Sequence, residues 1–130
     1  MQSMNFLAIA VAAGAAVVTS VVWYTLFAGP MAKLGNAGAV GAGTAPILAM
    51  LFVVAQSLVV AFMVAYLVSR LAISGLVDAA GFGALIWIFP AAILLGSVVH
   101  EGVPPTLAGI HAGDWLAKLI LISAILGAWR

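Results

Sequence analysis

Long apolar runs, separated by short stretches rich in glycine, proline or charge, make up most of the chain. Crossing about 30 Å of hydrocarbon takes roughly 20 consecutive apolar helical residues. Four runs meet this length, at about 5–27, 46–70, 76–99 and 105–129. The pattern predicts an all-α fold, a transmembrane four-helix bundle in a single integral membrane domain covering residues 1–130. Because two connections are short, neighbouring helices should be antiparallel.

Local residues refine the expected helices. Pro90 lies inside the third run, where it removes a backbone hydrogen bond and predicts a kink. Trp23 and Tyr24, near the end of the first run, resemble the aromatic belt found at membrane interfaces. The first connection, AGPMAKLGNAGAVGAGTAP, contains five glycines. We expect it to lack regular structure, above all across Gly35 to Gly43.

Composition agrees with a membrane location. Hydrophobic residues make up 67% of the chain and charged residues 5%, against about 25% charged in ordinary globular domains. A net charge of +1 gives no reason to expect a nucleic-acid partner. The absence of cysteine excludes disulfides, thiolate metal sites and cysteine nucleophiles. The first apolar run is too long for a cleaved signal peptide, so we expect none.

The few basic residues predict an orientation. Four spans place both termini on one side, together with Arg70 and Arg130, while Lys33 marks the other side. The excess of basic residues in cytoplasmic segments then favours cytoplasmic termini.

Five of the nine acidic, basic and histidine side chains gather between Val98 and Lys118. On a helix, three of them share one face at spacings i, i+3 and i+7, and Asp114 precedes Lys118 in the order that favours an ion pair. The other two end the third run on the same side of the membrane. We expect all five near one interface, because insertion at the bilayer centre costs about 2.5 to 3.5 kcal/mol per charge. This candidate polar cluster consists of His100, Glu101, His111, Asp114 and Lys118.

Three interpretations of the candidate polar cluster stay open. It is a hydrated patch with Asp114 and Lys118 paired, a proton or ion relay that continues toward Gln56, or a metal site. A metal site would use His100 and His111 with a carboxylate, a set suited to zinc or iron. The spacing matches no established metal motif, so no metal and no other cofactor is predicted.

Small residues recur every four positions and predict helix-packing faces. Such faces serve either the inside of the bundle or docking of another subunit. Gln56 should make an interhelical hydrogen bond worth about 0.6 to 2 kcal/mol, with Thr19 or Ser20 as partner. The expected packing positions are Ala8, Ala12, Ala16 and Ser20 in the first run, Ala92 and Gly96 in the third, and Gly109, Gly113 and Ala117 in the fourth.

Several landmarks occur together: MNFLAI opens the first run, WYTLFAGPMAK closes it, GFGALIW enters the third, HEG follows it, and ILGAWR ends the chain. In their order and spacing the chain resembles the bacterial Domain of Unknown Function 1761 family. The resemblance covers nearly the whole chain and implies a four-span protein of the bacterial cytoplasmic (inner) membrane. It brings no assigned activity.

The chain departs from the family pattern in its fourth run. Relatives read INAG followed by an aromatic residue and a histidine, whereas this chain reads IHAGDWLAK. Relatives also have a more charged first connection. His111 and Asp114 are therefore expected to be particular to this chain.

Three classes of function remain. The first is a non-catalytic helix-packing protein, either an accessory subunit of a larger membrane complex or a homo-oligomer, with lipid and other membrane subunits as partners. The second is a small carrier or channel for protons, ions or a small apolar solute. The third is a metal-dependent membrane enzyme. No catalytic constellation occurs in the sequence, so we do not expect an enzyme.

Overall fold

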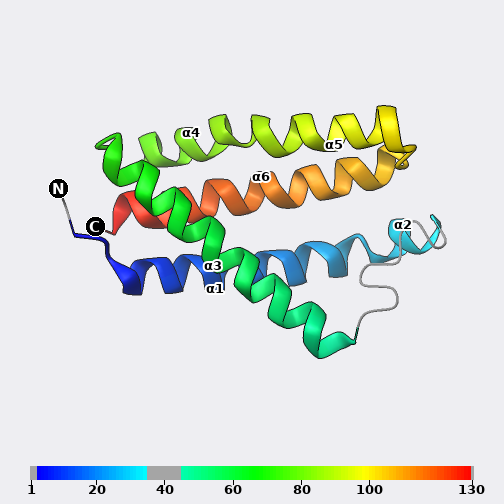
Figure 1. Cartoon of the computed structure of the whole chain (residues 1–130), viewed down its shortest axis with the longest axis horizontal. Helices are drawn as coiled ribbons and strands as arrows, with labels where there is room; N and C mark the ends of the chain where they lie inside the picture. The colour runs from blue at the N-terminus through cyan, green and yellow to red at the C-terminus, as the bar shows by residue number, and fades with distance from the viewer. Residues whose placement is uncertain (1–2, 35–44, 130) are drawn as a thin grey trace.

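The computed structural model describes residues 3–34 and 45–129, and over these residues all regular structure is helical (Figure 1). This confirms the all-α class. The helices are α1 (Phe6–Leu26), α2 (Ala28–Ala32), α3 (Pro46–Arg70), α4 (Leu76–Ile86), α5 (Ile88–Glu101) and α6 (Pro105–Ala128).

Four of the described helical segments are long and apolar enough to cross a membrane, namely α1, α3, α4 continued by α5, and α6. Their ends agree with the predicted runs to within two residues. The side chain of Asn5 starts α1 by accepting a hydrogen bond from the Ala8 amide at 3.0 Å. Prolines open α3 and α6, where a missing N–H costs nothing. Gly102, with φ of 69°, ends α5 in the left-handed conformation.

The third span is interrupted at Trp87, which separates α4 from α5. Trp87 lies three positions before Pro90, whose ring nitrogen cannot donate to the carbonyl of Ile86. The interruption therefore falls in the turn that the proline affects. The kink at Pro90 stays a prediction.

The expectation of an irregular first connection is wrong over its first residues, where the short helix α2 forms. Met31 of α2 is buried and packs in a small apolar cluster with Leu107 and Ile110 of α6. This burial accounts for helix formation in a segment with a glycine and a proline. The prediction for Gly35 to Gly43 lies outside the described residues.

Helix α6 occupies the middle of the molecule, with α1 on one side and α4 and α5 on the other (Figure 1). The start of α1 and the end of α6 lie at the same end. Helix α3 crosses the others obliquely, so that its C-terminal half packs on them while its N-terminal half diverges. The main core joins α1, α3 and α6, and its largest side chains are Ile9, Val64, Val68, Leu119, Ile122 and Leu126.

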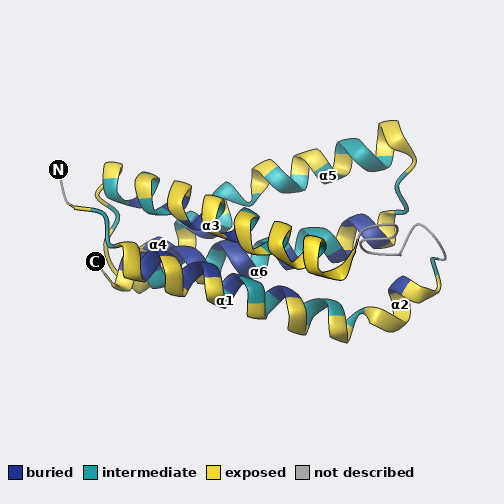
Figure 2. Cartoon of the chain, turned by 60° about the horizontal axis from the view of Figure 1, so that its bottom comes forward, coloured by how far each residue is buried: buried dark blue, intermediate teal, exposed yellow. Residues whose placement is uncertain are grey.

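Burial is confined to the faces that the helices turn toward one another, and the outer faces are exposed and apolar (Figure 2). Helix α5 contains no buried residue. Helix α4 approaches α6 very closely, because Gly83 lies against the backbone of Leu119 and Gly127 lies against Ala79. These glycines allow a helix contact that a side chain would prevent.

Candidate functional site

The centre of the site is an ion pair inside the molecule. Nζ of Lys118 lies 2.8 Å from Oδ2 of Asp114. Both residues are buried, with 6% and 1% of their surface exposed. Their i, i+4 spacing on α6, with the acid first, brings the two side chains together on one face. Burying an ion pair costs several kcal/mol per ion before their attraction is counted, so its other contacts matter.

Helix α1 supplies those contacts through two hydroxyl groups one turn apart. Oγ of Ser20 donates to Oδ1 of Asp114 at 2.9 Å, and the Tyr24 hydroxyl donates to Oδ2 at 3.4 Å. The same hydroxyl lies 2.6 Å from Nδ1 of His111. Since a hydroxyl has one proton, it donates to Asp114 only in the tautomer in which Nδ1–H of His111 donates to it. The Lys118 ammonium also lies 3.9 Å from the centre of the Trp115 ring, within cation–π range. The central polar network therefore consists of Ser20, Tyr24, His111, Asp114 and Lys118.

Two tryptophans donate hydrogen bonds to backbone carbonyls of α6 beside this network. Nε1 of Trp23 donates to the carbonyl of Ile110 at 2.9 Å, and Nε1 of Trp87 donates to the carbonyl of Ala112 at 2.8 Å. Gly113 leaves room for Trp23, because a Cβ at this position would overlap the indole ring. The position of α6 is therefore fixed from α1 and from the junction between α4 and α5.

A groove opens beside the central polar network, where α3 diverges from α1 and α6. Its volume is about 740 Å³. Its polar lining comes from two residues of α1, two residues of α6 and Gln56 of α3, while aliphatic and aromatic side chains form most of the rest. Such a mixture of an apolar wall and a few convergent polar groups is typical of small-molecule sites. The groove is lined by Ser20, Val21, Tyr24, Leu48, Ala49, Met50, Phe52, Val53, Gln56, Asp114, Trp115 and Lys118.

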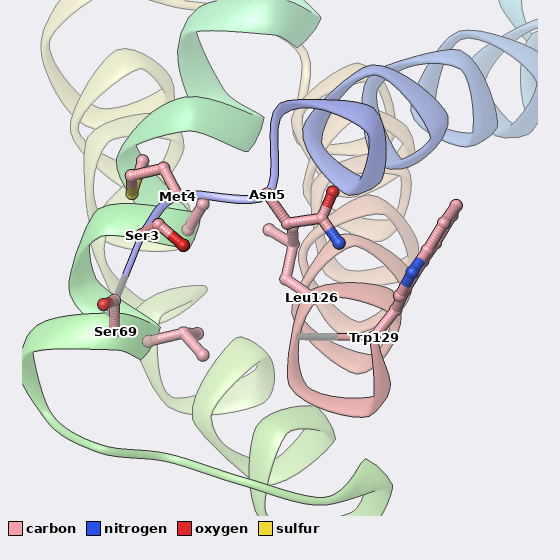
Figure 3. A pocket seen from close by; sticks show the side chains of 8 residues that line it. Ser3, Met4, Asn5, Ser69, Leu126 and Trp129 are labelled. Carbon is pink, nitrogen blue, oxygen red and sulfur yellow. The ribbon is translucent and has the colours of Figure 1, made fainter.

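A second cavity, of about 380 Å³, lies where the chain enters α1 and α6 ends (Figure 3). Its polar groups include Ser3, Asn5 and Ser69, and Trp129 forms part of its wall. The amide oxygen of Asn5 already caps α1. Because none of the described residues that line this cavity is charged, the groove beside the central polar network is the better candidate site.

The structure divides the candidate polar cluster. His111, Asp114 and Lys118 meet, whereas His100 and Glu101 lie exposed at the end of α5. Within residues 3–34 and 45–129, no hydrogen bond or ion pair joins those two side chains to the other three. Nor does this part of the chain contain a group of three or more histidine or acidic side chains placed to hold a metal. The structure thus does not assemble the ligand set built on His100 and His111.

The ion pair lies in the middle part of its helix. Lys118 lies close to the midpoint of α6 and Asp114 lies one turn before it. Hydrogen bonds from α1 satisfy the carboxylate without water. The placement of the cluster near a membrane interface stays a prediction.

The structure buries some of the predicted helix-packing residues and exposes others. Ala8, Ala12, Ala16 and Ser20 are all buried, so the face expected on α1 exists. On α6, Gly113 is packed against Trp23 and Ala117 is half-buried, but Gly109 is exposed with no neighbour for a Cβ.

On α5, Ala92 is exposed, and Gly96 is half-buried with open space around it. Spacing on the sequence indicates a shared face but not which helix covers that face.

The hydrogen bond expected for Gln56 is not formed. Thr19 donates to the carbonyl of Ala15 at 2.8 Å, and Ser20 donates to Asp114. Among the described residues, the half-buried Gln56 has no side-chain hydrogen bond and instead lines the groove.

Sequence reasoning missed the roles of Ser20 and Tyr24, which it assigned to packing and to an interfacial belt. Their i, i+4 spacing at the polar end of an apolar helix was the available signal.

Comparison with known proteins identifies the family. The family described as "Protein of unknown function (DUF1761)" matches residues 7–127, which is nearly the whole chain. No curated protein and no solved structure matches the chain. With the four apolar helices in place and the match extending over all of them, the chain belongs to the DUF1761 family.

Proposed function

We propose that this protein is a multi-pass protein of the bacterial cytoplasmic membrane that binds a small, largely apolar molecule in the groove, as a carrier. The four apolar helices support membrane insertion, and the family resemblance supports the bacterial membrane. The proposal involves no chemical step, no metal and no other cofactor.

The buried pair of Asp114 and Lys118 carries this proposal. Well-packed apolar residues in place of a buried ion pair are often neutral or stabilising. A protein that needed only to pack its helices would therefore gain little from the pair. Ionisable groups within a membrane span usually mark a ligand or ion pathway. Here both residues line a groove large enough for a small molecule.

A packing role, as an accessory subunit or a homo-oligomer, has less support. The small residues of α1 are buried inside the molecule, so they are not available to a partner. Contact with lipid alone explains the exposed apolar residues of α5, so they are no evidence for a partner subunit.

The test is to fill the groove with a large side chain and to identify the small molecules that remain bound to the protein. Val53 lines the groove, whereas its neighbour Val54 is exposed and does not. Wild type, Val53→Trp and Val54→Trp would be purified in native lipid particles, and their bound small molecules compared by mass spectrometry. We expect a molecule enriched over bulk lipid in wild type and Val54→Trp, and lost from Val53→Trp. Identical profiles for all three proteins would contradict the proposal.

A further inference from the structure

We infer that the ligand of the groove is a neutral molecule with an apolar body, whose polar head presents a carbonyl or hydroxyl oxygen to Lys118 and Gln56. This inference rests on the proposed function and narrows the class of ligand.

The charge balance of the groove indicates a neutral ligand. Among the described residues, the charged ones that line it are Asp114 and Lys118, which neutralise each other at 2.8 Å. Glu101, Lys33 and Arg70 are exposed and do not line the groove. A ligand with a net charge would therefore enter a poorly solvated space without an opposite charge to balance it.

The unused hydrogen-bonding groups indicate what the ligand must present. The Lys118 ammonium has three protons. One faces Oδ2 of Asp114, and the ring of Trp115 lies against the same ammonium. At least one N–H is left in a residue with only 6% of its surface exposed. A buried donor without an acceptor is unfavourable, so an oxygen acceptor on the ligand would complete its hydrogen bonds.

Gln56 of α3 adds a second polar group to the lining of the groove. It lies near the midpoint of α3, as Lys118 lies near the midpoint of α6, and both line the groove. Its amide has two donor protons and one acceptor oxygen, and none is used within the described residues. A hydroxyl can donate to Gln56 while accepting from Lys118, and a carbonyl can accept from both.

Both carboxylate oxygens of Asp114 already accept hydrogen bonds, so Asp114 is a weaker partner for a ligand. Oδ1 of Asp114 accepts from Ser20, and Oδ2 accepts from Lys118 and from Tyr24. A cationic head would have to compete with Lys118 for this carboxylate. The remaining lining, which includes Leu48, Phe52 and Val53, suits an alkyl or aromatic body.

The test uses three probes with one alkyl chain and different heads: n-decanol, decanoic acid and decylamine. The chain has no cysteine, so a single thiol can be introduced at Val53→Cys, with Val54→Cys as the matched control. The reagent is a water-soluble methanethiosulfonate, applied to protein in lipid vesicles. We expect Val53→Cys to react faster than Val54→Cys, because an unoccupied groove with buried charges holds water.

n-Decanol should slow the modification of Val53→Cys several-fold and leave Val54→Cys unchanged. Decanoic acid and decylamine should give no protection beyond that of the control position. Protection by n-decanol should be lost when Asp114→Leu and Lys118→Met are combined, since this removes the ammonium donor, adds no other donor and keeps the groove neutral. It should be weakened by Gln56→Leu.

Stronger protection by decanoic acid or decylamine would overturn the inference, as would equal reaction rates at the two cysteines. If no probe protects Val53→Cys while a molecule still co-purifies and is lost from Val53→Trp, the inference fails and the proposed function stands. If neither co-purification nor protection depends on the groove, both fail.

Discussion

The carboxylate of Asp114 holds side chains from two helices. Ser20 and Tyr24 approach it from α1, and Lys118 approaches it from one turn further along α6. Because only 1% of the surface of Asp114 is exposed, its carboxylate is hydrogen-bonded by these side chains instead of by water. The stability of each charge therefore depends on the presence of the other.

Removing one charge should destabilise the protein more than removing both. Lys118→Met leaves a buried carboxylate without its counter-ion, and Asp114→Asn leaves a buried ammonium. Each single variant should lose about 3 to 5 kcal/mol of the free energy of unfolding. The combined variant should lie close to wild type. Denaturant titration in detergent micelles measures all three, with Lys33→Met at an exposed position as the control. Additive losses in the combined variant would show that the two charges act independently.

At the level of single residues, the sequence predicted part of the site. The pairing of Asp114 and Lys118, and the shared face of His111, follow from helical spacing within one segment. The contacts of Ser20 and Tyr24 depend on which helix lies beside α6, and spacing along one helix carries no such information. For the same reason, the prediction that His100 lies beside the other members of the candidate polar cluster was not confirmed.

The contact between α4 and α6 depends on glycine rather than on interlocking side chains. A Cβ at Gly83 would overlap the backbone of Leu119 and approach that of Ile120. Backbone atoms of a neighbouring helix cannot rotate away as a side chain can. Sequence reasoning did not single out Gly83, because an isolated glycine in an apolar helix resembles Gly81, which has no neighbour at all.

These two glycines give a matched pair of variants. Gly83→Ala should force α4 away from α6 and destabilise the protein by about 1 to 3 kcal/mol. Gly81→Ala meets open space on the same helix, and alanine is favoured over glycine in a helix by roughly 0.5 to 1 kcal/mol, so it should be neutral or stabilising. Thermal unfolding of both variants in the same detergent provides the measurement. Equal effects would mean that α4 and α6 are not in close contact.

For the whole molecule, an apolar exterior encloses a polar centre. The outer faces of α3, α4 and α5 expose large aliphatic and aromatic side chains (Figure 2). Four members of the central polar network, Ser20, Tyr24, Asp114 and Lys118, line the groove. The proposed ligand site therefore lies between helices whose outer faces are apolar.

Three basic residues predict the orientation in the membrane, and two introduced cysteines test this prediction. Arg70 lies at the end where α1 begins and α6 ends, and Lys33 lies at the opposite end (Figure 1). With Arg130 at the C-terminus, two basic residues against one favour cytoplasmic termini. Ala32 and Ser74 are exposed at the two ends. In intact spheroplasts, a membrane-impermeant maleimide should label Ala32→Cys, and it should label Ser74→Cys only after lysis. The reverse pattern would invert the orientation. Equal labelling of both positions before lysis would mean that the two ends do not lie on opposite sides of the membrane.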